Sequence, residues 1–301
     1  CRGRTTVTAV EPAGERDLAA FRSLVLERGR ELYRDLPWRR TRDPYQIWIS
    51  EVMLQQTQTT RVDGRWQRWL ERFPTPSALA AAAPADVLEE WQGLGYNRRA
   101  LSLHRAAQAV DALGGGLPSE TAALEALPGV GPATAAGIRA FAFDLPSVYL
   151  ETNVRTVLLH ELFPGEERVS DRALVPILAA TCPPDATDPA DDPRAWYYAL
   201  LDYGAYLKRT VPNPSRRSSA HTRQSRFEGS HRQKRAELLR VLLAHRENVA
   251  GGVDFETICE ELASAEQKAG RSALGAADVR ALLEELAAEG FCRQANGVWT
   301  V

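Results

Sequence analysis

The stretch from Leu124 to Arg155 constrains the fold more than any other part of the chain. Within it, the run Leu127-Pro128-Gly129-Val130-Gly131 joins an apolar segment to a segment of small, helix-forming residues. The chain must therefore turn tightly between two helices. The two glycines permit that turn and leave backbone N–H groups uncovered at the start of the second helix, where the helix dipole favours a phosphate group. The sequence predicts a helix-hairpin-helix with a phosphate-binding turn.

A carboxylate follows this hairpin at a defined distance. Glu151 comes five residues after Pro146 and directly before a segment that Thr152 or Asn153 could cap as a helix. An acid at a helix start is stabilised in its ionised form by the helix dipole. We expect Glu151 to be a functional carboxylate, although an ordinary acidic residue at a helix start is the plain alternative.

A second carboxylate lies on an earlier helix. Asp43-Pro44 is a typical helix start, and the segment from Tyr45 to about Thr59 is predicted to be helical. Along it, Glu51 and Gln55 are four residues apart and share one face. Burial among apolar neighbours would favour the protonated form of Glu51. The alternative is a structural glutamate paired with an arginine such as Arg39.

Three segments together resemble the helix-hairpin-helix (HhH-GPD) DNA glycosylase superfamily, and within it the MutY and endonuclease III group. LPGVGPATA resembles the hairpin, LETNVRTVL the segment with the catalytic aspartate, and PWRRTRDPYQIWISEVMLQQTQ the opening of MutY. The resemblance covers roughly residues 30 to 210. It implies an all-α, two-lobed fold and a base-excision DNA glycosylase. The chain departs from the family at Glu151, where the family has Asp.

The resemblance assigns roles to individual residues. Cleaving an N-glycosidic bond through an oxocarbenium-like state requires an ionised carboxylate near the sugar, here Glu151, and a protonated acid near the base, here Glu51. Flipping a base out of the duplex requires a wedge, a pocket and a grip on the backbone. The expected wedge is Gln55, Gln56 and Tyr96; the base pocket is Arg39, Trp48, Ala133 and Tyr198; the DNA-backbone contacts are Gly129, Val130, Gly131, Thr134, Asn153, Arg216, Arg217 and Arg226. Taken alone, a tyrosine such as Tyr96 is more often a half-buried core residue.

The expected reaction is hydrolysis without strand cleavage. Ala133 occupies the position of the lysine nucleophile of endonuclease III, so no AP-lyase activity is expected. The first expected substrate is adenine opposite 8-oxoguanine. Because Ala133 and Tyr198 differ from the pocket residues of relatives, a modified pyrimidine such as uracil or 5-hydroxymethyluracil is the alternative. A DNA-lesion-binding protein without catalysis is a second alternative.

The cysteines predict no metal centre. Cys1, Cys182, Cys259 and Cys292 are far apart and lack paired metal-ligand spacing. Most relatives carry an iron–sulfur cluster, but Lys208 stands where the first cluster cysteine would be. We expect neither an iron–sulfur cluster nor another metal, apart from a possible monovalent cation at the hairpin.

Positive charge is concentrated in one segment of the sequence. The formal net charge is −2, yet residues 208–240 contain ten basic residues and two acidic ones. Such a run is often ordinary solvated surface, but here it favours contacts with DNA phosphates. The expected partner is double-stranded DNA containing a lesion or mismatch, bound by a monomer. No apolar run is long enough to cross a membrane, and a cytoplasmic, nucleoid-associated protein is expected.

The predicted domains follow from these segments. Residues 1–15 are a flexible lead, and residues 16–230 form a discontinuous glycosylase domain. One lobe comprises 16–42 and 156–207, the other 43–155, and 208–230 is a basic segment in place of the cluster loop. Residues 231–301 resemble a winged helix: three helices are followed by two short strands around Asn296-Gly297, a hairpin-turn sequence.

Overall fold

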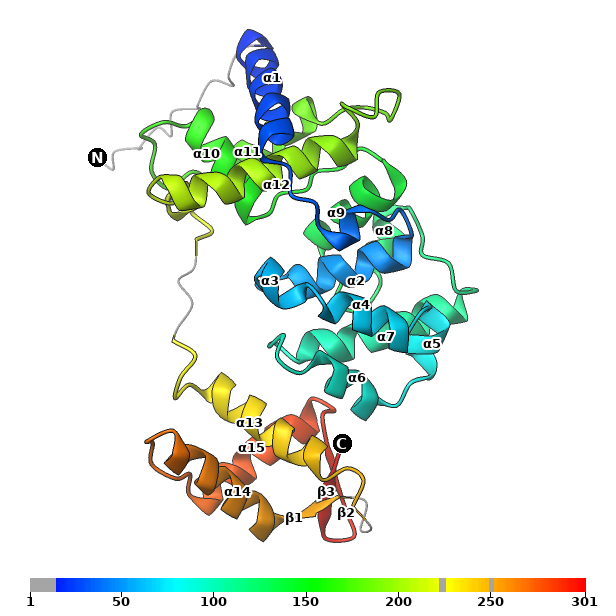
Figure 1. Ribbon diagram of the computed structural model, residues 1–301, viewed down its shortest axis with the longest axis vertical. Helices are drawn as coiled ribbons and strands as arrows, with labels where there is room; N and C mark the ends of the chain where they lie inside the picture. The colour runs from blue at the N-terminus through cyan, green and yellow to red at the C-terminus, as the bar shows by residue number, and fades with distance from the viewer. Residues whose placement is uncertain (1–14, 222–225, 249–251) are drawn as a thin grey trace, which may run out of the picture. The chain divides into compact units, whose positions relative to one another are not determined.

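The computed structural model describes residues 15–221, 226–248 and 252–301. Most of the predicted flexible lead, together with Cys1 and Arg223, lies outside these residues. The described chain is predominantly helical (Figure 1). Its residues divide into two compact units. The first unit comprises residues 1–42, 119–121 and 131–222, and the second comprises 43–118, 122–130 and 223–301. Residues 131–155, which we expected in the lobe with 43–130, group with the first unit instead.

The first unit is built on one long helix. α12 (Pro193–Thr210) packs against both α1 (Glu15–Leu32) and α10 (Thr152–Glu161). Phe21 on α1 meets the fully buried Trp196 on α12 edge to face, with ring centroids 6.0 Å apart. The other elements of this unit are η1 (Pro37–Arg39), α9 (Pro132–Phe143), α11 (Asp171–Thr181) and η2 (Pro214–Arg217), with the start of α8 (Thr121–Glu125) at its boundary.

The second unit begins with a group of short helices. They are α2 (Pro44–Leu54), α3 (Thr59–Val62), α4 (Arg65–Arg72), α5 (Pro76–Ala81), α6 (Pro84–Trp91) and α7 (Arg98–Ala112). α7 packs against α5 and α6, and Trp69 meets Trp91 edge to face at 5.6 Å in the core. The predicted cap of α2 is confirmed, because the Asp43 side chain accepts hydrogen bonds from the N–H groups of Tyr45 and Gln46.

α2 is shorter than the sequence predicts. It ends at Leu54 rather than near Thr59, because Gln55 leaves the helical conformation and Gln56 takes a left-handed one, with φ 53°. α5 was not predicted at all. It begins at Pro76 after Thr75, whose side chain accepts a hydrogen bond from Ala78 N–H.

The C-terminal part of the second unit combines three helices with a small sheet. α13 (His231–Ala244), α14 (Phe255–Lys268) and α15 (Ala276–Ala288) accompany an antiparallel sheet in the order β1-β3-β2. β2 (Arg293–Ala295) and β3 (Val298–Thr300) form the predicted hairpin, with Asn296 and Gly297 both at positive φ as a type I′ turn requires. β1 (Val253–Asp254) was missed because two residues are too short to show an alternating pattern.

Candidate functional site

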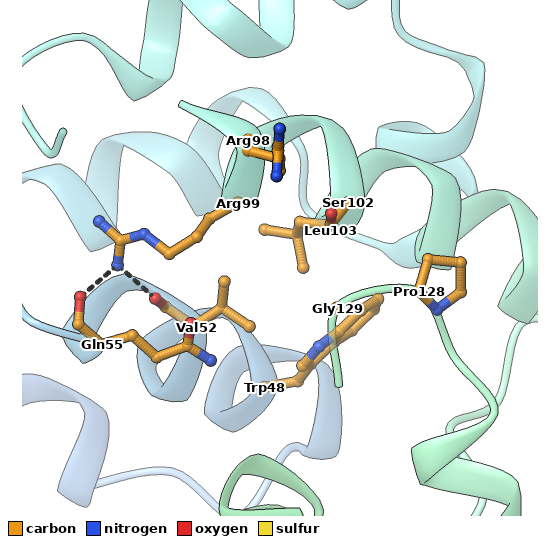
Figure 2. Close-up of a pocket in the computed structure, with 9 residues that line it drawn as sticks. All are labelled: Trp48, Val52, Gln55, Arg98, Arg99, Ser102, Leu103, Pro128 and Gly129. Atoms are coloured by element: carbon orange, nitrogen blue, oxygen red, sulfur yellow. Dashed lines mark hydrogen bonds between the residues drawn. The ribbon is translucent and has the colours of Figure 1, made fainter. Parts of the chain in front are cut away.

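The hairpin turn of the second unit closes one end of a pocket. The pocket lies between α2, α7 and the turn (Figure 2). Three predicted site residues meet there: Trp48, which is fully buried, Gln55 and Gly129. Its complete lining is Trp48, Val52, Gln55, Arg98, Arg99, Ser102, Leu103, Pro128 and Gly129.

Gly129 is required at this turn for two reasons. Its φ of +78° is unfavourable for any residue with a side chain, and a Cβ there would lie 2.7 Å from the Cβ of Ser102 on α7. The backbone of the turn therefore packs directly onto α7. Beyond the turn, Gly131 precedes α9 as its N-cap with Pro132 in the first turn, as predicted for the second helix of the hairpin.

Arg99 was not identified from the sequence, yet it connects both segments that carry the expected wedge. One terminal nitrogen donates to the carbonyl oxygens of Val52 and Gln55 at the end of α2 (Figure 2), and also to that of Met53. The other donates to Leu94 O and Gly95 O in the loop before α7, and to the Thr57 hydroxyl. Burial lowers the pKa of Arg99 to about 10, so the guanidinium remains charged at neutral pH.

The residues predicted to form the wedge lie on these two segments. Gln56 is exposed, and Tyr96 has φ 49° and is 38% exposed, which is unusual for a core tyrosine. The Tyr96 hydroxyl accepts a hydrogen bond of 2.7 Å from Arg232 on α13. An aromatic ring held at a strained, exposed turn fits a residue that contacts a partner.

Glu51 lies on α2 and is half-buried, between the buried residues Ser50 and Val52. It is less buried than the sequence suggested. Arg39, the partner considered for it, belongs to the first unit and pairs there with Asp202 at 2.7 Å.

In the first unit, Glu151 is the N-cap of α10. Its Oε1 accepts hydrogen bonds from the N–H groups of Asn153 at 2.5 Å and Val154 at 2.9 Å. The expectation that Thr152 or Asn153 would cap this helix is wrong, because the carboxylate of the preceding residue occupies the capping position. We expected the helix to favour the ionised form of Glu151, but burial has the larger influence. Burial raises the pKa of Glu151, while Lys208 and the two N–H groups lower it.

Two residues expected in the base pocket are engaged within the first unit. The Tyr198 ring stacks on Phe141 with centroids 4.5 Å apart, and the Arg39 guanidinium lies 4.3 Å from its centre. Arg39 and Asp202 are both almost fully buried, and Arg34 adds a second ion pair to Asp202. The geometry of Arg39 and Tyr198 is that of a packed core cluster. Ala133, by contrast, is exposed on the first turn of α9.

The remaining predicted DNA-backbone residues differ in exposure. Arg216 and Arg226 are exposed, whereas Thr134 is buried within α9. Arg217 donates to the carbonyl oxygens of Leu159, Phe163 and Glu166 near the end of α10, a helix-capping arrangement rather than a solvent-facing one. Asn153 is hydrogen-bonded through its side chain to both Glu151 and Lys208.

The cysteines do not fit an iron–sulfur cluster. Cys182 follows α11 in the first unit, while Cys259 and Cys292 belong to the second. In the described part of the chain, no group of three or more His, Cys, Asp or Glu side chains is arranged to hold a metal ion. Such a cluster is commonly held by four cysteine thiolates, and the three cysteines in the described part of the chain are divided between the two units. The cation considered at the hairpin stays a prediction.

Comparison with known proteins shows to which family the chain belongs. Residues 49–268 match the family model of the HhH-GPD superfamily base excision DNA repair protein. An adenine DNA glycosylase of Mycolicibacterium smegmatis is 37% identical over 228 residues, covering 69% of this chain and 75% of the relative. The adenine DNA glycosylase of Mus musculus is 36% identical over 215 residues, covering 68% of this chain but only 40% of the relative.

Solved structures with a similar fold include a thermostable thymine-DNA glycosylase, with TM-score 0.55 and 25% identity over 63% of this chain and 87% of that one. A trapped covalent endonuclease III–DNA intermediate gives TM-score 0.52 and 16% identity over 73% of this chain and 93% of that one, which supports the fold alone. The chain belongs to the HhH-GPD superfamily of base-excision DNA repair proteins. Within the described residues, no helix is both long and apolar enough to cross a bilayer.

Proposed function

We propose that this chain is a DNA glycosylase that hydrolyses the N-glycosidic bond of adenine opposite 8-oxoguanine in duplex DNA. The observation that carries the proposal is the carboxylate of Glu151, held by two backbone N–H groups at the start of α10 in the segment that matches the family. Relatives named adenine DNA glycosylase favour adenine as the base.

Each carboxylate has a distinct role in this reaction. Glu151, ionised, stabilises the positive charge that develops on the sugar and orients the attacking water. Glu51, protonated, donates a proton to the departing base. Glu151 is longer than the family's Asp by one methylene, and its hydrogen bonds to α10 set where the carboxylate lies.

The reaction ends at an abasic site. Ala133 has no amine with which to form a Schiff base, so water is the nucleophile and strand cleavage does not follow. We propose further that the enzyme acts as a monomer, without an iron–sulfur cluster, where genomic DNA is found, as a cytoplasmic protein of the nucleoid. Iron content and the absorption spectrum of the purified protein test the cluster directly.

The decisive experiment is single-turnover base release from duplexes containing A:8-oxoG, A:G, U:G, 5-hydroxymethyluracil or hypoxanthine, analysed with and without alkali. The proposal predicts cleavage of the adenine strand of A:8-oxoG only after alkali treatment. Strand cleavage without alkali would contradict the monofunctional reaction. No release from any duplex would favour the alternative of a lesion-binding protein without catalysis.

Variants of Glu151 separate catalysis from binding. Glu151→Gln keeps a capping oxygen but removes the charge, so base release is expected to fall by about 100-fold or more while DNA affinity is retained. Glu151→Asp restores the family's residue and should keep measurable activity. Equal activity of Glu151→Gln and wild type would exclude a catalytic role for this carboxylate.

A modified or mismatched pyrimidine is the second candidate substrate. The similar fold of a thermostable thymine-DNA glycosylase supports it, as does the exposed Ala133 on α9. Preferred release of a pyrimidine from the same set of duplexes would establish this substrate instead of adenine.

A further inference from the structure

Lys208 lies beside the start of α10, although it belongs to the last turn of α12. Its Nζ donates a hydrogen bond of 2.8 Å to Oδ1 of Asn153. The side chain is half-buried, so this contact is partly shielded from water. A lysine held in this way presents a positive charge to the end of α10 that carries Glu151.

Asn153 links Lys208 to the carboxylate. While its Oδ1 accepts from Lys208, its Nδ2 is 3.4 Å from Oε2 of Glu151 and its backbone N–H donates to Oε1 at 2.5 Å. Both ends of the amide are therefore used, and the bond to Lys208 determines which end faces the carboxylate. Lys208, Asn153 and Glu151 form a chain of hydrogen bonds across two helices.

The backbones of these helices touch one turn away. A Cβ at Gly204 on α12 would lie 2.2 Å from the carbonyl oxygen of Asn153, which leaves no room for a side chain. α12 and α10 also pack along their lengths. Since rigid secondary elements hold both Lys208 and Asn153, the chain of hydrogen bonds is set by the fold.

We propose that Lys208 is a positioning residue of the glycosylase reaction, which holds the Glu151 carboxylate in place through Asn153 and offsets the cost of burying its charge. The proposal rests on the function proposed above. Lys208 acts on the carboxylate and takes no covalent part in the reaction.

The charges around Glu151 support this role. Burial is the main influence on its carboxyl and raises its pKa, whereas the Lys208 ammonium is the largest opposing influence. Arg155, on α10 itself, contributes less and is paired with Asp171. From η2, which also packs on α10, Arg217 binds carbonyl groups at the opposite end of the helix.

The test is the pH dependence of single-turnover base release in wild type, Lys208→Met and Lys208→Arg. The ionised form of Glu151 is active, so the rate falls as pH drops through its pKa. Removing the ammonium raises that pKa, and the acidic limb of Lys208→Met should move to higher pH, with a loss of about 10-fold to 100-fold at the plateau. Lys208→Arg keeps the charge and should keep the acidic limb near that of wild type. Lys268→Met removes the same charge from the exposed end of α14 and serves as the matched control.

A second measurement does not depend on activity. The carboxyl of Glu151 is titrated by ¹³C NMR in DNA-free protein, with Glu151→Gln used to assign the resonance. A higher pKa in Lys208→Met than in wild type supports the proposal, and an unchanged pKa together with an unchanged rate profile overturns it. If wild type released no base, the proposed function would fail, whereas the titration would still report whether Lys208 acts on Glu151. A borohydride-trapped DNA adduct that Lys208→Met abolishes would make Lys208 a nucleophile and overturn its assignment as a positioning residue.

Discussion

Asp202 is a buried carboxylate that pairs with two arginines of the first unit. Its side chain is 1% exposed and accepts from Arg39, which is 2% exposed, and from Arg34. Removing one member of a buried ion pair leaves the other charge without compensation, at a cost much larger than the net contribution of the pair itself. The cluster also fixes the guanidinium that lies over the Tyr198 ring.

We expect Asp202→Ala to lower the free energy of unfolding by about 3–5 kcal/mol, because Arg39 stays buried without its carboxylate. Urea unfolding followed by circular dichroism measures this change. Asp35→Asn is the control, since Asp35 and Arg40 form an exposed pair and little change is expected there. If the free energy of unfolding fell by no more than in the control, solvent or another residue would be compensating the buried charge of Arg39.

For single residues, helix caps and turns could be predicted from the sequence, whereas ion pairs between residues far apart in the sequence could not. The Asp43 cap and the Asn296-Gly297 turn depend only on neighbouring residues, and the structure confirms both. Asp202 is 163 residues from Arg39, so no local pattern connects them. Glu151 is an intermediate case: the residue was identified, but capping preferences favoured Thr152 or Asn153 over a glutamate.

At the scale of elements, the approach of α12 to α10 depends on a single glycine. Gly204→Ala would place its Cβ 2.2 Å from the Asn153 carbonyl oxygen and push the helices apart. We expect a loss of about 1–3 kcal/mol in the free energy of unfolding, despite the better helix propensity of alanine. Thermal unfolding measures it, with Gly116→Ala as the control because a Cβ there meets no atom within 4 Å. Equal stability of the two variants would contradict the close packing of α10 and α12.

The two segments joined by Arg99 should loosen together when its guanidinium is removed. Arg99→Met removes one donor from each of the carbonyl groups of Val52, Gln55 and Leu94, which keep only longer bonds from the Gln55 N–H and the Thr57 hydroxyl. We expect faster amide hydrogen exchange at residues 55–58 and 93–97, and a loss of roughly 1–3 kcal/mol in the free energy of unfolding. Arg105→Met, at an exposed position of the same helix, is the matched control. Faster exchange in only one of the two segments would show that Arg99 does not couple them.

The elements themselves were largely predictable, because caps and apolar periodicity are local properties. The ends of the elements could not be predicted, as α2 shows. It ends at Leu54, where the guanidinium of Arg99 binds the carbonyl group of Val52, and these two residues are 47 positions apart in the sequence. The pocket beside α2 brings together Trp48, Gln55 and Gly129, for which the resemblance implied three different roles. Arg99 itself was missed because an arginine that binds backbone carbonyls leaves no characteristic spacing.

At the scale of the whole molecule, an acidic protein must bind a polyanion through a local surface. The net charge is −2, but ten of the 37 lysines and arginines lie between residues 208 and 240, against two acidic residues. Binding that releases counterions weakens with salt in proportion to the number of phosphates contacted. The steepness of this dependence therefore reports how many phosphates the basic side chains contact.

We expect Arg216→Gln and Arg226→Gln each to reduce the slope of log affinity against log salt by about 0.9, because both side chains are exposed. Fluorescence anisotropy with a labelled duplex at several salt concentrations measures the slope. Lys268→Gln, on α14, should leave the slope unchanged. Slopes equal to wild type in both arginine variants would assign the basic segment to ordinary solvated surface.

The domain arrangement was the least predictable property, since it depends on how distant segments pack. The sequence placed residues 43–155 in one lobe, whereas residues 131–155 group with the first unit in the structure. The break falls inside the hairpin itself, between Val130 and Gly131. Continuity of a motif along the chain does not establish that it belongs to a single compact unit.

The contacts of Arg99 have a mechanical consequence. A side chain inserted between stacked base pairs is pushed back by the tendency of those pairs to restack, so Tyr96 would bear this force in the wedge role that the resemblance implies for it. Because one guanidinium binds both the end of α2 and the loop that carries Tyr96, a force on either segment is shared with the other and passes into α7. The end of α2 and the loop that carries Tyr96 are therefore stiffened together by Arg99.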